Sequence, residues 1–163
     1  MHIAVVGEPD LAELLPLMRA YCDFYGVTPG DEALLDLAHT LVADPDREGF
    51  QLIARDDEGR AVGFATVYWT WSTLAAARTA IMNDLFVSPD ARGTGLAEAL
   101  VEECRVRSGR RGAVSMGWQT KKDNARAQRL YERVGASRAE WVDYSLDTAS
   151  TTSGRKPESE SSP

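Results

Sequence analysis

A short glycine turn between a predicted strand and a predicted helix is the feature that most constrains this chain. The turn reads Arg92-Gly93-Thr94-Gly95-Leu96-Ala97, and it separates an apolar run that ends at Val87 from a segment of helical periodicity that begins at Leu96. In such a junction, successive backbone N–H groups can point at one anion, and the following helix adds the positive end of its dipole. The sequence therefore predicts a phosphate-binding site at this turn.

The spacing of the turn separates it from two common phosphate-binding motifs. A dinucleotide-binding turn needs Gly or Ala where this chain has Glu98, and a carboxylate there would repel a pyrophosphate. A P-loop needs Gly-Lys-Ser or Gly-Lys-Thr, which does not follow the turn. The remaining pattern is Arg-x-x-Gly-x-Ala, formed by Arg92, Gly95 and Ala97. An ordinary tight turn that only needs small residues stays open as an alternative.

Composition and charge narrow the classes of partner. With 163 residues, 44% of them apolar, the chain suits one globular domain, expected over residues 1–147. The formal net charge of −7 argues against nucleic acid, which needs a basic surface, and is compatible with a cationic substrate. No run of 18 apolar residues and no secretory signal pattern are present, so we expect a cytoplasmic protein that does not enter membranes. Residues 148–163 are almost entirely polar and are expected to form a disordered tail.

Hydrophobic periodicity predicts a mixed sheet flanked by helices, an α/β (α+β) fold. Strands are expected at residues 2–6, 51–55, 61–71, 78–87, 113–119 and 137–146, and helices at 9–25, 29–42, 96–107 and 123–134. Strict alternation along the strand before the turn would place one set of side chains on one face, Ile81, Asn83, Leu85 and Val87, and the other set on the opposite face, Met82, Asp84 and Phe86.

A second segment supports a specific family. Residues 118–135 read WQTKKDNARAQRLYERVG, with Asn124 near a helix start and Tyr131 seven residues later. Seven residues at about 100° each return to within about 20° of the starting direction, so both side chains share one helix face. Together with the glycine turn and the preceding residues 83–89, this segment resembles the GCN5-related N-acetyltransferase (GNAT) family, whose acetyl-coenzyme A signature is Q/R-x-x-G-x-G/A. The resemblance covers residues 51–146. Residues 71–73, 83–87 and 123–131 look most like the branch that acetylates polyamines, diamines and basic protein tails.

The resemblance implies a GNAT fold in which splayed strands form a cleft for acetyl-CoA. The turn would bind the pyrophosphate, and the backbone of the strand before it would bind the pantetheine arm and the thioester carbonyl. Asn124 would bind the same arm, although a helix N-cap is an alternative role for its side chain. The implied cofactor-binding residues are Leu85, Phe86, Val87, Arg92, Gly93, Thr94, Gly95, Leu96, Ala97, Asn124 and Tyr131.

The chemistry needs an acid, a base and a site for the amine. Tyr131 is the candidate acid for the departing thiolate, with core packing as its alternative. Asp84 is the candidate base for the amine, and a purely structural carboxylate or an anchor for the acceptor's ammonium stays open for it. Tyr25, Asp31 and Glu32, together with Asp84, are expected to bind a cationic acceptor through aromatic faces and carboxylates.

These residues predict direct transfer of an acetyl group from acetyl-CoA to a small primary amine, such as a polyamine, a diamine or a lysine-like molecule. We expect a homodimer without a metal ion. Two alternatives remain: a non-catalytic acyl-CoA sensor, and an acetyltransferase for protein lysines or N-termini.

Overall fold

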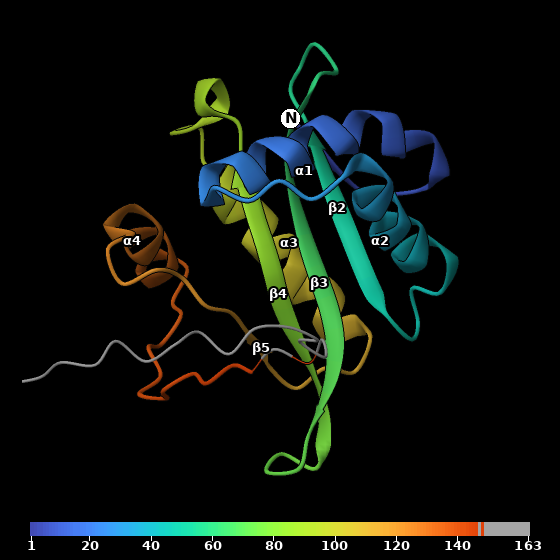
Figure 1. Cartoon of the computed structure of the whole chain (residues 1–163). Coiled ribbons are helices and arrows are strands. Elements are labelled where there is room, and N and C mark those ends of the chain that lie inside the picture. The colour runs from blue at the N-terminus through green and yellow to red at the C-terminus, as the bar shows by residue number, and fades with distance from the viewer. Residues whose placement is uncertain (147, 149–163) are drawn as a thin grey trace, which may run out of the picture.

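Five strands form one sheet that carries helices on both faces (Figure 1). The computed structural model describes residues 1–146 and 148, so the predicted tail lies outside the described residues except for Thr148. The strands are β1 (His2–Val5), β2 (Gly49–Arg55), β3 (Ala61–Ser72), β4 (Ala77–Val87) and β5 (Met116–Gly117). The α-helices are α1 (Leu11–Tyr25), α2 (Asp31–Ala43), α3 (Leu96–Arg110) and α4 (Ala125–Arg133), with short 3-10 turns η1 (Glu8–Asp10) and η2 (Pro89–Ala91).

The two faces of the sheet carry separate apolar clusters. Helices α1 and α2 cover one face and α3 covers the other, as Figure 1 shows. Leu14 of α1 packs with Phe64 of β3 in the first cluster, and both side chains are buried. Leu100 and Cys104 of α3 are buried in the second cluster. The predicted arrangement of a mixed sheet between helices is therefore confirmed.

The sheet is complete on one side of β4 and nearly open on the other. Its order is β1-β2-β3-β4-β5, and the first four strands are antiparallel neighbours. β5 runs parallel to β4 and pairs with it at only two positions, Ala80 with Met116 and Ile81 with Gly117. The rest of β4, up to Val87, has no strand partner on that edge among the described residues. Unpaired backbone groups of this kind need another hydrogen-bonding partner.

A β-bulge in β4 overturns the predicted alternation. Thr66 of β3 pairs with Asp84, whereas the next residue, Val67, pairs with Met82, so Asn83 is an extra residue in β4. Met82 therefore packs in the α3-side cluster together with Val87, while Phe86 packs in the α1-side cluster. Strict alternation had assigned Met82 and Phe86 to one face. An extra residue reverses which side chains face which layer, and this cannot be read from polarity alone.

The last two predicted strands also need correction. The segment 113–119 forms a strand only at Met116–Gly117, because β4 and the following chain separate beyond that point. The predicted strand at 137–146 is wrong, since residues 136–146 contain no strand. Its apolar side chains Trp141, Tyr144 and Leu146 are 82%, 93% and 93% exposed, and none of them has a strand against which to pack. The alternating pattern supplied strand propensity without a neighbour, and a strand needs both.

No helix among the described residues is long and apolar enough to cross a lipid bilayer.

Gly63 brings the end of β4 close to α3, and an added methyl group should disturb this contact. A Cβ at this position would lie 2.9 Å from the Phe86 carbonyl oxygen and 3.5 Å from side-chain carbons of Leu96 and Leu100. We expect Gly63→Ala to lower the free energy of unfolding by about 1–3 kcal/mol, as overpacking generally does. Gly109→Ala in α3 is the matched control, because its Cβ would meet no atom within 4 Å. It should stabilise the helix by about 0.5–1 kcal/mol. Denaturant unfolding of both variants measures the two effects, and a neutral Gly63→Ala would contradict the packing argument.

Candidate active site

The predicted phosphate turn is a left-handed turn that opens α3. Gly93 and Gly95 have φ angles of +84° and +85°, a region that side-chain-bearing residues rarely adopt. Gly95 is the N-cap of α3 and offers no side chain to the first helical N–H groups. Those N–H groups are left to bind an anion, with the helix dipole behind them. The backbone therefore forms a glycine turn at a helix start, and phosphate binding at this turn stays a prediction.

This turn forms one end of a cleft of about 360 Å³. The cleft runs along the unpaired edge of β4, and α4 and the chain after β5 form its opposite wall. The C-terminal end of α1 adds Tyr21, Phe24 and Tyr25 to its lining. The predicted cofactor-binding residues that line it are Leu85, Phe86, Val87, Arg92, Gly93, Gly95, Leu96, Ala97, Asn124 and Tyr131.

Thr94 is the one predicted cofactor residue that does not line the cleft. Its hydroxyl donates to the carbonyl oxygen of Ala91 at 2.8 Å, which fixes the turn from behind. The Arg92 side chain is also held in place, because its Nε donates to the Val87 carbonyl oxygen at 3.0 Å.

Glu98, whose carboxylate argued against a dinucleotide site, lines the cleft and forms an ion pair with Arg133 of α4. This pair neutralises a carboxylate that would otherwise repel a phosphate.

Asn124 and Tyr131 lie on the same face of α4 and both line the cleft. The Asn124 side-chain oxygen accepts a hydrogen bond from the Ala127 N–H at 3.2 Å. The side chain therefore caps α4, which is the alternative role that the sequence left open for Asn124. Its amide nitrogen remains available as a donor toward the cleft. The Tyr131 ring packs edge-on against Trp118, with ring centroids 5.1 Å apart. Burial raises the pKa of the Tyr131 phenol, and the nearby Tyr25 adds to the increase.

Asp84 is partly buried and does not itself line the cleft, although its neighbours Asn83 and Leu85 do. Burial raises the pKa of its carboxyl group, and hydrogen bonds from Thr66, Tyr21 and Asn83 partly offset this increase. The Asn83 amide nitrogen lies 3.0 Å from the carboxylate oxygen Oδ1. Asp84 shares the α1 side of β4 with Phe86, two residues later, and the bulge at Asn83 separates it from Met82 on the α3 side.

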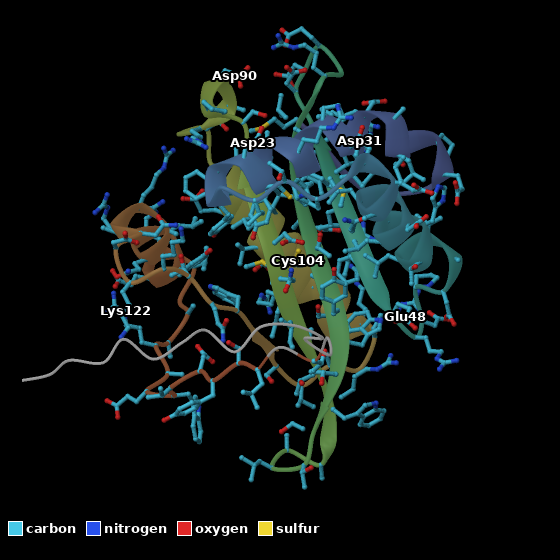
Figure 2. All side chains as sticks on the ribbon, viewed as in Figure 1. Asp23, Asp31, Glu48, Asp90, Cys104 and Lys122 are labelled. Carbon is cyan, nitrogen blue, oxygen red and sulfur yellow. The ribbon has the colours of Figure 1, made fainter. Side chains whose placement is uncertain are left out.

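Among the residues predicted to bind the acceptor, only Tyr25 lines the cleft. Asp31 is exposed at the first turn of α2 and forms an ion pair with Arg19 of α1, and Glu32 follows it on the same exposed turn. Figure 2 shows Asp31 beside α1 and α2, well away from Lys122 near α4. The chain reverses between α1 and α2, and this turn carries the two carboxylates away from the aromatic end of α1.

Sequence reasoning missed two contacts that only the fold creates. Trp118 packs on Tyr131 from 13 residues away and forms part of the cleft wall. Lys121 places its ammonium 4.9 Å from the centroid of the Tyr25 ring, joining the loop before α4 to α1. Spacing within one helix could not reveal either contact, although an aromatic residue just before the predicted Asn124–Tyr131 helix was a weak signal. Within residues 1–146 and 148, no group of three or more His, Cys, Asp or Glu side chains could hold a metal ion.

The buried Asp84 should weaken the fold at neutral pH. In the unfolded chain its carboxyl group titrates near 3.9, and in the folded protein burial raises the pKa above that value. The contribution of Asp84 to the free energy of unfolding is therefore most favourable at low pH. It is lost as the pH rises from the pKa of the unfolded chain through the pKa of the folded protein. We expect Asp84→Asn to raise Tm at pH 7 and to give a smaller gain at pH 3.

Thermal unfolding as a function of pH measures this effect. Asp36→Asn, an exposed position on α2, is the control and should give no comparable pH-dependent gain. A loss of stability in Asp84→Asn at pH 7 would show that hydrogen bonds to the carboxylate outweigh the cost of its burial.

Comparison with known proteins gives a consistent assignment. The acetyltransferase (GNAT) family model matches residues 14–136. The N-acetyltransferase YhfO of Bacillus subtilis (strain 168), itself uncharacterised, is 33% identical over 138 residues, covering 83% of this chain and 89% of that protein. The D-amino-acid N-acetyltransferase HPA3 of Saccharomyces cerevisiae is 34% identical over 109 residues, 66% of each chain. The crystal structure of a probable acetyltransferase superposes with a TM-score of 0.79 at 29% identity, covering 90% of this chain and 97% of that one.

The glycine turn, the opened sheet and these matches lead to one conclusion: the chain belongs to the GNAT family and is an acetyl-CoA-dependent N-acetyltransferase.

Proposed function

We propose that the cleft transfers an acetyl group directly from acetyl-CoA to the primary amine of a small cationic molecule. The observation that carries this proposal is continuity: one cleft joins the glycine turn, the unpaired edge of β4 and the aromatic end of α1. A phosphate-bearing cofactor can occupy one end while an amine approaches from the other. The two substrates would meet beside β4, with no covalent enzyme intermediate.

The cofactor half of the proposal follows from available hydrogen-bonding groups. The N–H groups of the turn and of the first turn of α3 would bind the pyrophosphate, because they lack a side-chain cap. The open edge of β4 at Leu85–Val87, apart from the Val87 carbonyl oxygen that accepts from Arg92, would bind the pantetheine arm as a neighbouring strand binds a peptide. An N–H group on this edge would also stabilise the oxyanion that forms when the thioester is attacked. The free amide nitrogen of Asn124 would bind the arm from the opposite wall.

The reaction requires two proton transfers, one from the acceptor ammonium and one to the departing thiolate. An alkylamine has a pKa near 10.4, so only about one molecule in 2,500 is neutral at pH 7, which corresponds to about 4.6 kcal/mol of barrier. Asp84 is the proposed base, acting from its buried position. The departing thiolate must gain a proton, and Tyr131 is the proposed acid because its phenol lies in the cleft and burial keeps it protonated. The same burial would also raise the pKa of the coenzyme A thiol. The difference between the two pKa values therefore stays small, and proton transfer from the phenol to the thiolate costs little free energy.

The acceptor half rests on aromatic faces. Tyr21 and Tyr25 line the cleft, and their rings meet edge to face at 4.9 Å. Lys121 demonstrates that the Tyr25 ring can hold an ammonium group. Asp31 and Glu32 lie outside the cleft, so the cationic preference depends on these rings and on the general acidity of the protein.

A second acceptor class is an amino acid. The relative HPA3 is named for acetylating D-amino acids, and Lys121 is a cation at the acceptor end that could bind a carboxylate.

Gly95→Glu should abolish acetyl-CoA binding. The new side chain would place a negative charge where the pyrophosphate is proposed to bind. Gly95→Ala is the matched control, since it imposes the same left-handed backbone strain, about 1–2 kcal/mol, without the charge. Calorimetry should show affinity at least about 100-fold lower for the glutamate variant and a smaller loss for the alanine variant. Equal affinities for the two variants would contradict the assignment of the turn.

Tyr131→Phe should lower kcat about 10²-fold, because it keeps the ring against Trp118 and removes only the proton donor. Acetyl-CoA affinity and Tm should change little. Tyr144→Phe, at a 93% exposed position, is the control for loss of a hydroxyl. Single-turnover kinetics isolate the chemical step, and an unchanged rate would show that solvent protonates the thiolate.

A panel of amines, assayed by thiol release from acetyl-CoA, tests the acceptor. We expect spermidine and lysine analogues to exceed neutral and acidic amines, with rates that fall as salt rises, because salt screens exposed charges over about 10 Å at 0.1 M. Faster turnover of amino acids that have a free carboxylate would favour the second acceptor class. Cofactor binding without turnover of any amine would point to the sensor alternative, and turnover of peptides alone would point to a protein acetyltransferase.

A further inference from the structure

A row of buried polar side chains crosses three strands beneath α1. Gln51 of β2 pairs in register with Thr66 of β3, and Thr66 pairs with Asp84 of β4. Gln51 and Thr66 are 2% and 0% exposed, and the Gln51 amide nitrogen donates to the Thr66 hydroxyl oxygen at 3.1 Å. Because that oxygen accepts from Gln51, the Thr66 hydroxyl hydrogen is free to be donated to Asp84. The row therefore ends on a carboxylate.

This row is costly to the fold. Among the described residues, the buried Gln51 side-chain oxygen has no hydrogen-bond partner, and no cation is among the hydrogen-bonding neighbours of the partly buried Asp84 carboxylate. Buried polar groups that are incompletely satisfied reduce stability. Side chains used only for packing would avoid that cost, so the arrangement calls for a functional explanation.

Two residues connect the Asp84 carboxylate to the cleft, Asn83 and Tyr21, and Tyr21 is the one whose hydroxyl can both accept and donate a proton. Asp84 does not line the cleft, but Asn83 and Tyr21 do: Asn83 donates to the Asp84 carboxylate at 3.0 Å, and the Tyr21 hydroxyl lies near enough to that carboxylate to affect the pKa of both groups. The Tyr21 ring is fixed by edge-to-face contacts with Phe64 and Phe86, at centroid distances of 5.8 and 6.4 Å. Asp84 and Phe86 follow the bulge two residues apart and share the α1 side of the sheet, whereas Met82 before the bulge packs on the α3 side. The hydroxyl is thereby held between the carboxylate and the place where an amine would bind.

We propose that Tyr21 is a catalytic residue that passes a proton from the bound acceptor ammonium to Asp84. This inference rests on the proposed function. The ammonium N–H bond breaks as its proton moves to the Tyr21 oxygen, while the Tyr21 O–H bond breaks as its hydrogen moves to the Asp84 carboxylate. The amine is then neutral and attacks the thioester. Its second proton leaves after the attack and ends on the thiol, and Asp84 returns its own proton to solvent through the same hydroxyl.

The surroundings of Asp84 suit this role. The titratable groups that face it are Tyr21 and Cys22 of α1 and Tyr68 of β3, and their pKa values are all raised, that of Tyr68 to about 12. Thr66 and Asn83 contribute neutral hydrogen bonds. Asp84 is thus the carboxylic acid of this set, whose ordinary pKa of about 3.9 is far below those of the tyrosines and the cysteine. Tyr21 stays protonated and serves as a neutral carrier, because burial and the neighbouring Asp84 raise its pKa.

The kinetic test compares Tyr21→Phe with the wild-type protein, using spermidine at pH 7 to 9.5. With the relay intact, kcat/KM should level off above the pKa of Asp84, because the ammonium form is then usable. Without the hydroxyl, only the small neutral fraction of the amine reacts, so kcat/KM should rise about tenfold per pH unit. The variant should be about 10²-fold slower near pH 7 and should approach the wild type by pH 9.5. Parallel profiles would mean that Tyr21 only packs, and this result would overturn the proposal.

Tyr68→Phe is the matched control, because its hydroxyl is near Asp84 but neither lines the cleft nor hydrogen bonds to that carboxylate. Its profile should follow the wild type. The double variant Tyr21→Phe/Asp84→Asn should be no slower than the slower single variant, because both changes interrupt one relay. A multiplicative loss would contradict a shared path.

A second measurement is independent of catalysis. The carboxyl carbon of Asp84, followed by NMR in the protein without substrates and assigned with Asp84→Asn, reports the pKa directly. Tyr21→Phe should raise this pKa, since it removes a hydrogen bond to the ionised form. An unchanged pKa would overturn the relay. If the wild-type protein does not use spermidine at all, the proposed acceptor fails, and the titration alone decides the Tyr21–Asp84 link.

Discussion

The site depends on one constraint, which is the unpaired edge of β4. β5 pairs with β4 only at Ala80 and Ile81 and then departs, so the backbone from Met82 to Val87 lacks a strand on that side among the described residues. A strand edge with free N–H and C=O groups must be satisfied by water, by another chain or by a ligand. Here the edge forms one wall of the cleft and leads directly to the glycine turn. The fold thereby provides an extended hydrogen-bonding surface that ends at the glycine turn, as the proposed binding of a long cofactor with a pyrophosphate requires.

The bulge at Asn83 interrupts the regular pattern of β4 next to Asp84, the proposed base for the acceptor amine. By adding one residue to β4, it lets Asp84 and Phe86 lie on the α1 side while Met82 packs in the α3-side cluster. A carboxylate in that layer is a burden for stability, because burial opposes its ionised form. This loss of stability falls at the position where a base for the amine would be needed. Stability and reactivity thus compete at Asp84, as is common in active sites.

The parts of the site that sequence predicted well are those whose geometry is local. Gly93 and Gly95 had to form a left-handed turn at a helix start, and Asn124 and Tyr131 had to share a face of one helix. The parts that sequence missed depend on contacts between distant segments. Asn83 becomes a bulge only against β3, Asp31 is drawn to Arg19 of another helix, and Trp118 reaches Tyr131 across a loop. The strand pattern at 137–146 failed for the same reason, since alternation cannot supply a pairing partner.

The most direct test of the central claim is an NMR titration of the ¹⁵N-labelled protein with coenzyme A. Amide shifts report which backbone groups gain a hydrogen bond from the cofactor, and they need no acceptor. We predict the largest shifts at the turn, residues 93–97, together with a second set along Leu85–Val87 on the open edge of β4. Saturable binding that leaves both segments unshifted, with its changes on the outer faces of α1 and α2, would contradict the assignment of the cleft.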